Sequence, residues 1–490
     1  MTGATDFDVV VVGAGISGIA AAHYLQRECP DRSFVVLEGR QALGGTWDLF
    51  RYPGVRSDSD MFTLGYSFRP WTSDITMADG PSIRSYLQDT VRDERLGGRI
   101  RFGQRVTGAS WDSQAARWTL EVTATDGRVL RYTCRFLHFC SGYYAYEQGH
   151  DPDWPGRERF GGRIVHPQHW PEDLDYAGRR VVVIGSGATA VTLVPAMADR
   201  GAAHVTMLQR SPSYILAVPG RDALGRGLQR MLPRKLAYRL IRWKNILVAL
   251  GLFQYARRRP QAARKLLVKL ARKSAGPAVE ARHLEPRYQP WDQRLCFIPD
   301  ADLFRVLREG KASIVTDTIA SFTEAGLKLS SGEELPADIV VTATGLQLQL
   351  FGGAGVQVDG RTVRLPESLS YKGMMVSGVP NLALSMGYTN ASWTLRAELI
   401  ARQVCRMLNH MREHQLDVCV PVHEGEPGET RPALDLSSGY IARAADALPR
   451  QGSRKPWRIY QNYVLDLLSL KFSPVADGAL RFARRGEVPR

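Results

Sequence analysis

The sequence predicts an α/β protein with two Rossmann-like βαβ units, the second inserted into the domain that begins with the first. Two observations predict the units: one glycine-rich loop follows the apolar run 9–12, and another follows the apolar run 181–184. A third observation predicts the insertion. Residues 339–341 have the composition of a strand, and they lead into a small-residue turn, 343–345, that resembles the turn 140–142.

The first glycine-rich loop has the residues of a dinucleotide fingerprint and is followed by an acid. Its glycines allow a tight strand-to-helix turn that brings the backbone close to a pyrophosphate at a helix N-terminus. Glu38 lies 25 residues after Gly13, where a carboxylate accepts hydrogen bonds from a ribose 2′-hydroxyl and repels a 2′-phosphate. This unit is predicted to bind FAD through Gly13, Gly15, Ser17, Gly18 and Glu38.

The second loop has the same spacing but is followed by a base. Arg210 lies 25 residues after Gly185, and its guanidinium attracts a 2′-phosphate, which predicts NADPH. A chain with both units is expected to be a flavin-dependent oxidoreductase. The residues assigned to NADPH here are Gly185, Ser186, Gly187, Ala188, Thr189, Ala190, Arg210 and Ser211.

Length and cysteine usage exclude several classes of protein. A chain of 490 residues is long enough for two or three domains. Its six cysteines include no CxxC pair, which favours reduced thiols and argues against a redox-active disulfide or a metal site. Residues 1–12 do not resemble a secretory signal, and the aliphatic stretch Ile246–Phe253 is too short to cross a bilayer. We therefore expect a cytoplasmic protein without a metal.

The order of these features divides the chain into four segments. Residues 1–145 form the first part of the FAD-binding domain, and 146–178 form a polar linker rich in Pro and Gly. Residues 179–334 form the NADPH-binding domain, which includes a helical, basic insertion over 219–290. Residues 335–490 return to the FAD-binding domain and end in a C-terminal segment.

The linker contains the most specific motif of the chain. Residues 160–171 fit the pattern FxGxxxHxxxWP, which resembles the signature of type I Baeyer–Villiger monooxygenases, a group of class B flavin monooxygenases. The loop 44–54, with its GGTW and RYPG segments, strengthens the resemblance. Residues 45–52 and 291–294 are similar to the ethionamide-activating branch of that family.

The resemblance implies an activity and its partners. In the family, NADPH reduces FAD, the reduced flavin adds O2 at C4a, and the resulting peroxide attacks a carbonyl carbon to give an ester or lactone. The protonated peroxide can instead oxidise a sulfide or thioamide. Two alternatives stay open: a flavin N- or S-oxygenase without Baeyer–Villiger activity, and a membrane-associated flavoprotein that oxygenates nothing.

The resemblance also assigns residues to roles. An anion in a dry cavity needs a fixed positive charge, and by the family motif this is Arg294, with Asp58 as the carboxylate that orients it. His166 and Trp170 of the linker are assigned to conformational coupling between the domains. Many members have a lysine before the catalytic arginine, whereas this chain has Gln293, which leaves more of the phosphate binding to Arg210. Further contacts are implied for Arg56 with NADPH and, with FAD, for Gly45, Thr46, Trp47, Asp58 and Val106, the last on a short strand over 102–106.

A strongly basic segment interrupts the second unit. Residues 221–273 contain sixteen Lys and Arg against a single acid, Asp222, so they carry as much net charge as the whole chain, +15. Three interpretations compete: a solvated helical face over the substrate pocket, contact with an anionic membrane surface, and nucleic-acid binding. The last is disfavoured because no nucleic-acid-binding module accompanies the charge. We expect no nucleic-acid partner, a peripheral location at the inner face of the cell membrane as one alternative, and pocket-lining residues from 219–290 and 388–393.

Overall fold

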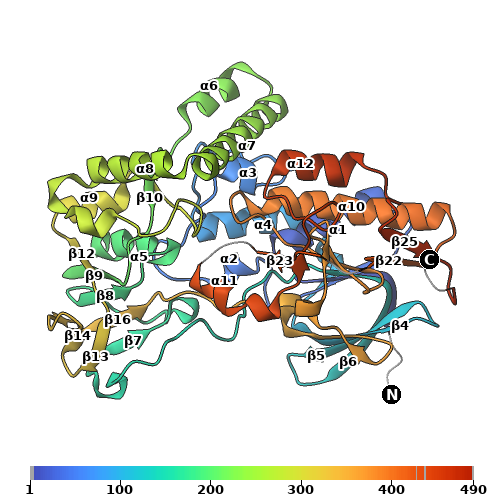
Figure 1. The fold of residues 1–490 in the computed structure, drawn as a ribbon, viewed down its shortest axis with the longest axis horizontal. Helices are drawn as coiled ribbons and strands as arrows, with labels where there is room; N and C mark the ends of the chain where they lie inside the picture. Colours follow the sequence, from blue (N-terminus) through green and yellow to red (C-terminus); the bar gives the residue numbers. More distant parts are fainter. Residues whose placement is uncertain (1–4, 426–427, 435–437, 488–490) are drawn as a thin grey trace.

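Two β-sheets form the framework of the molecule, the larger on the right of Figure 1 and the smaller on the left. The computed structural model describes residues 5–425, 428–434 and 438–487. The helical insertion lies along the upper side of both halves (Figure 1). This arrangement confirms the predicted α/β fold with two dinucleotide-binding units.

The larger sheet is built around β1 (Thr5–Val12), which runs parallel to β2 (Phe34–Leu37) on one side and β6 (Val129–Phe139) on the other. Residues 9–12 are buried on both faces of the sheet, so this strand is continuously apolar. Helix α1 (Ile16–Glu28) connects β1 to β2 and packs against α10 (Trp393–Glu413). The strand order is β18–β17–β4–β5–β6–β1–β2–β3 with β21 beside β6, where β3 is Ile100–Arg101, β4 Gln104–Asp112, β5 Arg117–Ala124, β17 Gly355–Val358, β18 Arg361–Thr362 and β21 Leu382–Leu384.

The smaller sheet is parallel throughout and repeats the βαβ plan. Helix α5 (Ala188–Asp199) follows the central strand β8 and leads to β9. The valines 181–183 of β8 are fully covered, as their unbroken apolar run predicts. The strand order is β12–β9–β8–β16–β7, where β7 is Arg163–Val165, β8 Arg180–Ile184, β9 His204–Gln209, β12 Ala312–Thr316 and β16 Ile339–Thr342.

Two predicted segment boundaries disagree with the observed sheets. Strand β16 pairs with β8 in the smaller sheet, so the expected return to the first domain at residue 335 is wrong. Strand β7 of the predicted linker 146–178 is the edge strand of the same sheet. The turns 140–142 and 343–345 look alike because each follows the strand beside its own glycine loop, rather than because both belong to one domain. The short strand expected over 102–106 is the longer β4, Gln104–Asp112.

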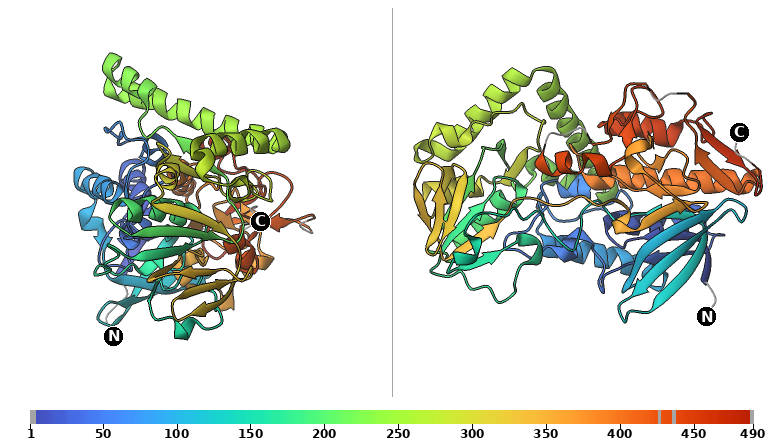
Figure 2. Two further views of the ribbon diagram at one scale, coloured as in Figure 1. Left: turned by 90° about the vertical axis from the view of Figure 1, so that its left-hand side faces the viewer. Right: turned by 60° about the horizontal axis from the view of Figure 1, so that its bottom comes forward.

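The basic insertion is helical, as predicted. It starts after β10 (Ile215–Val218) and ends before β11 (Cys296–Pro299), and these two strands pair in parallel at its base. Two views show the insertion projecting beyond the two sheets (Figures 1 and 2). No helix within the described part of the chain is long and apolar enough to cross a membrane. The helices of the insertion are α6 (Ala223–Met231), α7 (Arg234–Arg258) and α8 (Pro260–Ala275).

A buried arginine holds α7 on the first domain. Arg242 donates to the carbonyl oxygens of Phe62 (2.9 Å) and Gly65 (2.5 Å) and to Glu398 Oε2 (2.8 Å) on α10. Glu398 also accepts a hydrogen bond from the hydroxyl of Tyr24 on α1 at 2.9 Å. Both members of the ion pair are almost completely buried, so their mutual contact compensates for lost hydration.

The remaining elements complete the surface of the two halves. A turn of π-helix over Leu468–Phe472 directly follows α12. The other helices are α2 (Thr46–Leu49), α3 (Met61–Leu64), α4 (Gly80–Asp93), α9 (Asp302–Arg308), α11 (Gly439–Arg443) and α12 (Tyr463–Leu467). The other strands are β13 (Ile319–Thr323), β14 (Gly326–Leu329), β15 (Glu334–Pro336), β19 (Ser370–Tyr371), β20 (Met375–Val376), β22 (Val418–Pro421), β23 (Arg431–Pro432), β24 (Arg450–Gln451) and β25 (Leu480–Ala483).

Replacing Arg242 by Met is expected to destabilise the protein by about 3–5 kcal/mol, because Glu398 then lies buried without its cation. The measurement is the urea concentration at half-unfolding. Arg239→Met, an exposed neighbour on the same helix, serves as the control and is expected to change stability by no more than about 0.5 kcal/mol. Equal midpoints for the two variants would contradict the assigned role of Arg242.

Candidate functional site

A cavity of about 470 Å³ opens at the carboxyl ends of β1, β2 and β6. Crevices at this edge of a parallel sheet are where such folds bind dinucleotides. Of the residues predicted to contact FAD, the following line it: Gly13, Gly15, Glu38, Gly45, Thr46, Trp47, Asp58 and Val106.

The glycine loop after β1 is tight for a steric reason. Gly13 has a φ of +102°, and a Cβ there would lie 2.8 Å from the carbonyl oxygen of Cys140. A Cβ on Gly18 would lie 1.8 Å from the carbonyl oxygen of Gly13. Only glycine therefore fits at these two positions, and the loop leaves room for a ligand above it.

Glu38 is a buried residue that lines this cavity and is held by two backbone N–H groups. Its Oε2 accepts a hydrogen bond from the Ala14 N–H at 2.7 Å, and its Oε1 accepts one from the Arg40 N–H at 2.9 Å. Burial raises the pKa of this carboxyl, and the two backbone hydrogen bonds oppose the shift. Each carboxylate oxygen has a further lone pair, so the fixed group can also accept hydrogen bonds from ribose hydroxyls.

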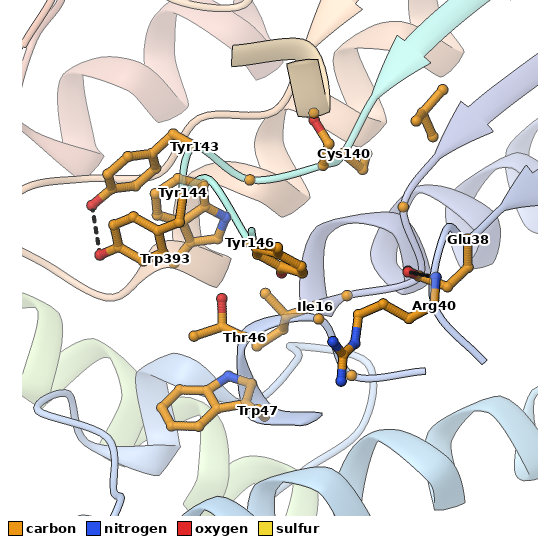
Figure 3. Close-up of a pocket in the computed structure, with 18 of the residues that line it drawn as sticks. Ile16, Glu38, Arg40, Thr46, Trp47, Cys140, Tyr143, Tyr144, Tyr146 and Trp393 are labelled. Atoms are coloured by element: carbon orange, nitrogen blue, oxygen red, sulfur yellow. Dashed lines mark hydrogen bonds between the residues drawn. The ribbon is translucent and has the colours of Figure 1, made fainter. Parts of the chain in front are cut away.

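Aromatic side chains form the opposite wall. Tyr143 stacks on Trp393 with ring centroids 5.0 Å apart, and its hydroxyl lies 3.1 Å from that of Tyr144. Figure 3 shows these three side chains at one end of the cavity and Glu38 at the other. The sequence analysis did not single out the two tyrosines, although they directly follow the turn 140–142. That position, after the strand beside the glycine loop, is the signal that could have identified them.

A polar atom without a partner also points to a ligand in this cavity. Ser141 Oγ lines the cavity and is buried, and among the described residues it has no hydrogen-bond partner. Buried hydroxyl groups in folded proteins are normally hydrogen-bonded, so a polar ligand group fits this position.

Arg294 and Asp58 meet at the border between this cavity and a second one. Arg294 Nη2 lies 3.4 Å from Asp58 Oδ2. The Asp58 carboxylate raises the pKa of Arg294 well above its usual value, against the effect of burial, and the hydroxyls of Tyr143, Tyr440 and Tyr144 add to the rise. The guanidinium therefore stays charged at every working pH. The structure brings together the two residues that the family motif assigns to catalysis.

A second cavity, of about 620 Å³, adjoins the first at this pair. Both cavities are lined by Asp58, Ser59, Arg294 and Ala391. More than half of the remaining lining comes from residues 219–252 and 389–392, which lie within the expected pocket-lining segments. Its surface is mostly apolar, with a charged group only at a few points, as in a site for a small organic substrate.

The second glycine loop repeats the geometry of the first. Gly185 has a φ of +136°, and a Cβ there would lie 2.3 Å from the carbonyl oxygen of Ala343. Gly187 is exposed at the N-terminus of α5, and a Cβ added there would meet no other atom. The Ser186 hydroxyl donates to the carbonyl oxygen of Ser211 at 3.1 Å. The loop thus presents free backbone N–H groups to an anion, while Ser186 and Ser211 hold each other.

Arg210 has a cationic neighbour that the sequence analysis missed. Arg443, at the end of α11, lies against Gly345, where an added Cβ would be 3.8 Å from Arg443 Nη2. Partial burial and the charge of Arg210 both lower the pKa of Arg443. An anion bound near both arginines would relieve this repulsion. More than 230 positions separate them in the sequence, so no local pattern could have paired them.

Several predicted contact residues make protein contacts instead of lining either cavity. The Ser17 hydroxyl accepts a hydrogen bond from Trp393 Nε1 at 2.8 Å, and Gly18 provides close helix–strand packing. In the second unit, Ala190 is fully buried in the core and Thr189 is hydrogen-bonded to the hydroxyl of Tyr52.

Arg56, which the resemblance assigns to NADPH, forms a two-pronged ion pair. Its Nη1 lies 2.5 Å from Asp302 Oδ2, and its Nη2 lies 3.3 Å from Asp302 Oδ1. Asp302 is the first residue of α9 in the second half of the molecule. The pair therefore joins the loop that carries Asp58 to the second half.

The linker motif contacts the wall of the first cavity. His166 Nδ1 accepts a hydrogen bond from the Gln168 N–H at 3.2 Å, and burial lowers the pKa of His166. The Gln168 amide in turn donates to the carbonyl oxygens of Ala145 and Tyr146 at 2.8 and 2.9 Å. Trp170 packs edge-on against Tyr176 and lines neither cavity. The motif thus connects the linker to the segment that carries the aromatic wall.

Comparison with known proteins places the chain in a family. Residues 11–74 match the model of an NAD(P)-binding Rossmann-like domain. The FAD-containing monooxygenase EthA of Mycolicibacterium smegmatis is 52% identical over 479 residues, which is 98% of this chain and 97% of that protein. The chain belongs to the FAD-containing monooxygenases. The putative FAD-containing monooxygenase MymA of Mycobacterium tuberculosis is 50% identical, with 97% of each chain covered. The predicted class of enzyme, a flavin monooxygenase that contains FAD, is thereby confirmed.

Solved structures share the fold. An oxidised steroid monooxygenase bound to NADP has a TM-score of 0.77 at 22% identity, covering 98% of this chain and 100% of that one. An open form of cyclohexanone monooxygenase has a TM-score of 0.72 at 24% identity, covering 86% of this chain and 90% of that one.

Replacing Gly13 by Ala is expected to abolish most FAD retention, because the added methyl group would overlap with the carbonyl oxygen of Cys140. The measurement is the ratio of flavin to protein absorbance after purification. Gly187→Ala is the matched control, since the second glycine loop has open space at that position, and we expect it to retain FAD fully. Full flavin content in Gly13→Ala would show that this loop does not hold FAD.

Proposed function

We propose that the chain is an NADPH- and O2-dependent monooxygenase of the Baeyer–Villiger type. It inserts one oxygen atom into ketones, giving esters or lactones, and also oxidises sulfides or thioamides. The observation that supports this most directly is the Arg294–Asp58 pair, which lies where a dinucleotide-sized cavity adjoins an apolar one.

The first cavity fits FAD. Glu38 would bind the ribose hydroxyls, the loop 13–15 the pyrophosphate, and the aromatic wall would lie beside the ring system. The orphaned Ser141 hydroxyl would gain a partner there. When bound and reduced by NADPH, FAD supplies the activation of O2 for transfer of one oxygen atom.

Arg294 supplies a fixed positive charge where the oxygen is transferred. Negative charge that develops on oxygen in a cavity with little water is costly unless a prepared cation meets it. Asp58 keeps the guanidinium charged and holds its direction, so no reorganisation is needed during the reaction. The apolar cavity behind the pair would hold the substrate and exclude water.

The second unit would bind NADPH. The open N-terminus of α5 would take the pyrophosphate, and Arg210 with Arg443 would bind the 2′-phosphate. Arg443 would thereby replace the lysine that many family members have at the position of Gln293. His166 and Trp170 would keep the linker in place while the two units move. A cytoplasmic location remains a prediction.

The test is product analysis with ¹⁸O2 and a cyclic ketone, comparing the wild-type enzyme with Arg294→Ala. We expect one labelled oxygen in the lactone, with NADPH consumption matching product. Loss of the cation is expected to lower product formation by about 100- to 1,000-fold while NADPH still reduces the flavin. FAD content of the variant is the control for folding. Oxidation of sulfides but not ketones would instead identify an S-oxygenase, and H2O2 as the sole product of the wild type would exclude oxygenation.

Replacing Arg443 by Ala is expected to raise the KM for NADPH by about tenfold or more, because one charge-assisted hydrogen bond to the phosphate is lost. The KM for NADH should not change, since NADH lacks that phosphate. Arg454→Ala, an exposed arginine in the same C-terminal segment, is the control. An equal effect of Arg443→Ala on both coenzymes would remove Arg443 from the phosphate site.

A further inference from the structure

Helix α7 is apolar on two opposite sides. One side, with Tyr238 and Ile241, is buried against the first domain. Four large apolar side chains on the other side are exposed at successive spacings of four, three and four residues, which places them in one stripe along the helix: Leu236, Leu240, Trp243 and Leu247. A water-soluble surface helix normally presents polar residues there, so this exposed stripe indicates an interaction surface.

The exposed apolar surface continues onto neighbouring elements. Trp243 packs edge-on against Tyr463 at the start of α12, with ring centroids 5.8 Å apart. After α12, the side chain of Phe472 is 63% exposed, and Met231 at the end of α6 is 82% exposed. Helices α6, α7 and α12 lie along the same, upper side of the molecule (Figure 1). We call this the α6–α7–α12 face.

Unpaired cations flank the stripe. Arg230, Arg234, Lys235 and Arg239 are exposed, and within the residues that the structure describes they make no ion pair. They belong to the segment 221–273, in which Asp222 is the only acid, and Asp222 already pairs with Lys244. A second copy of this chain on the same face would bring like charges together, whereas an anionic surface would neutralise them.

We propose that the α6–α7–α12 face docks on an anionic lipid bilayer and that the enzyme takes lipophilic substrates from it. Exposed apolar side chains between lysines and arginines are what an interfacial helix needs: the apolar atoms enter the boundary of the acyl region and the cations meet the headgroups. Since no described helix is suited to cross the bilayer, the contact is peripheral.

The substrate cavity opens between α6 and α7, two of the three helices of this face. Leu224 on α6 and Val248 on α7 both line the cavity, yet they are 61% and 65% exposed. The mouth therefore lies between the two helices, where the Asp222–Lys244 ion pair joins them. A ketone or sulfide with a long hydrocarbon chain could pass from lipid into the apolar cavity, with its reactive group at Arg294, without crossing water. This substrate class rests on the proposed oxygen-transfer function, whereas the docking does not.

The first experiment measures binding to phosphatidylcholine vesicles with and without phosphatidylglycerol. We expect binding only to the anionic vesicles and its weakening by salt. The variant Arg234→Glu/Lys235→Glu/Arg239→Glu is expected to bind at least about a hundredfold more weakly. The matched control Arg200→Glu/Arg361→Glu/Arg484→Glu changes the net charge by the same amount at exposed sites elsewhere. Its affinity for the anionic vesicles is expected to fall far less. Flavin content and unfolding midpoint verify that both variants fold.

Three results would overturn the docking proposal. The first is no preference for anionic vesicles, and the second is an equal loss of vesicle binding in both triple variants. The third is a stable dimer in solution that Leu240→Asp dissociates. The last would show that a second copy covers the stripe.

The second experiment tests entry of substrate from lipid. The triple variant on α7 is expected to raise the KM for a long-chain ketone presented in anionic vesicles and to leave turnover of a short, water-soluble ketone unchanged. If the triple variant and the wild type have the same KM for the vesicle-borne ketone, the proposed entry route is wrong. Absence of oxygenation of either ketone would reject the proposed function and would leave the vesicle-binding result to decide the docking alone.

Discussion

Burial of one charged side chain, Arg242, fixes the position of the helical insertion on the first domain. Its guanidinium can leave water only where carbonyl oxygens of residues 62–65 and the Glu398 carboxylate receive its N–H groups. Helix α7 therefore has one favourable position, and this helix lines the apolar cavity. The chain that closes the insertion carries Arg294, whose Nη2 lies 3.4 Å from Asp58 Oδ2 of the first domain.

A second constraint is steric and occurs twice. In each half, a glycine with positive φ lies against the carbonyl group at the end of the adjacent strand: Gly13 against Cys140, and Gly185 against Ala343. The close approach clears space above each loop for a dinucleotide. It also explains why two turns resemble each other in sequence although they belong to different sheets. The resemblance reflects the same strand-end turn beside each glycine loop, and the domain boundary drawn from it at 335 was misplaced.

Much of the site could be predicted because its residues lie in short motifs with a fixed local geometry. The first glycine loop and Glu38 are of this kind and line the first cavity, whereas Arg294 and Asp58, more than 230 positions apart, were paired only through the resemblance to the family. Other contacts between residues far apart in the sequence were missed. Arg443, in a distant segment, lies near enough to Arg210 for the charge of Arg210 to lower its pKa, and Arg56 pairs with Asp302 because that carboxylate is brought beside it only in the folded chain.

The sequence by itself determined the two βαβ units, the opposite charges at the ends of their second strands, the family and the basic character of the insertion, because each depends on residues close together in the chain. The tertiary structure decided which sheet receives β16, which aromatic side chains face the first cavity, and where α7 lies. It also decided that the apolar stripe of α7 faces outward. Helical periodicity shows that a helix has two apolar sides, but only packing against the rest of the molecule selects which one is buried.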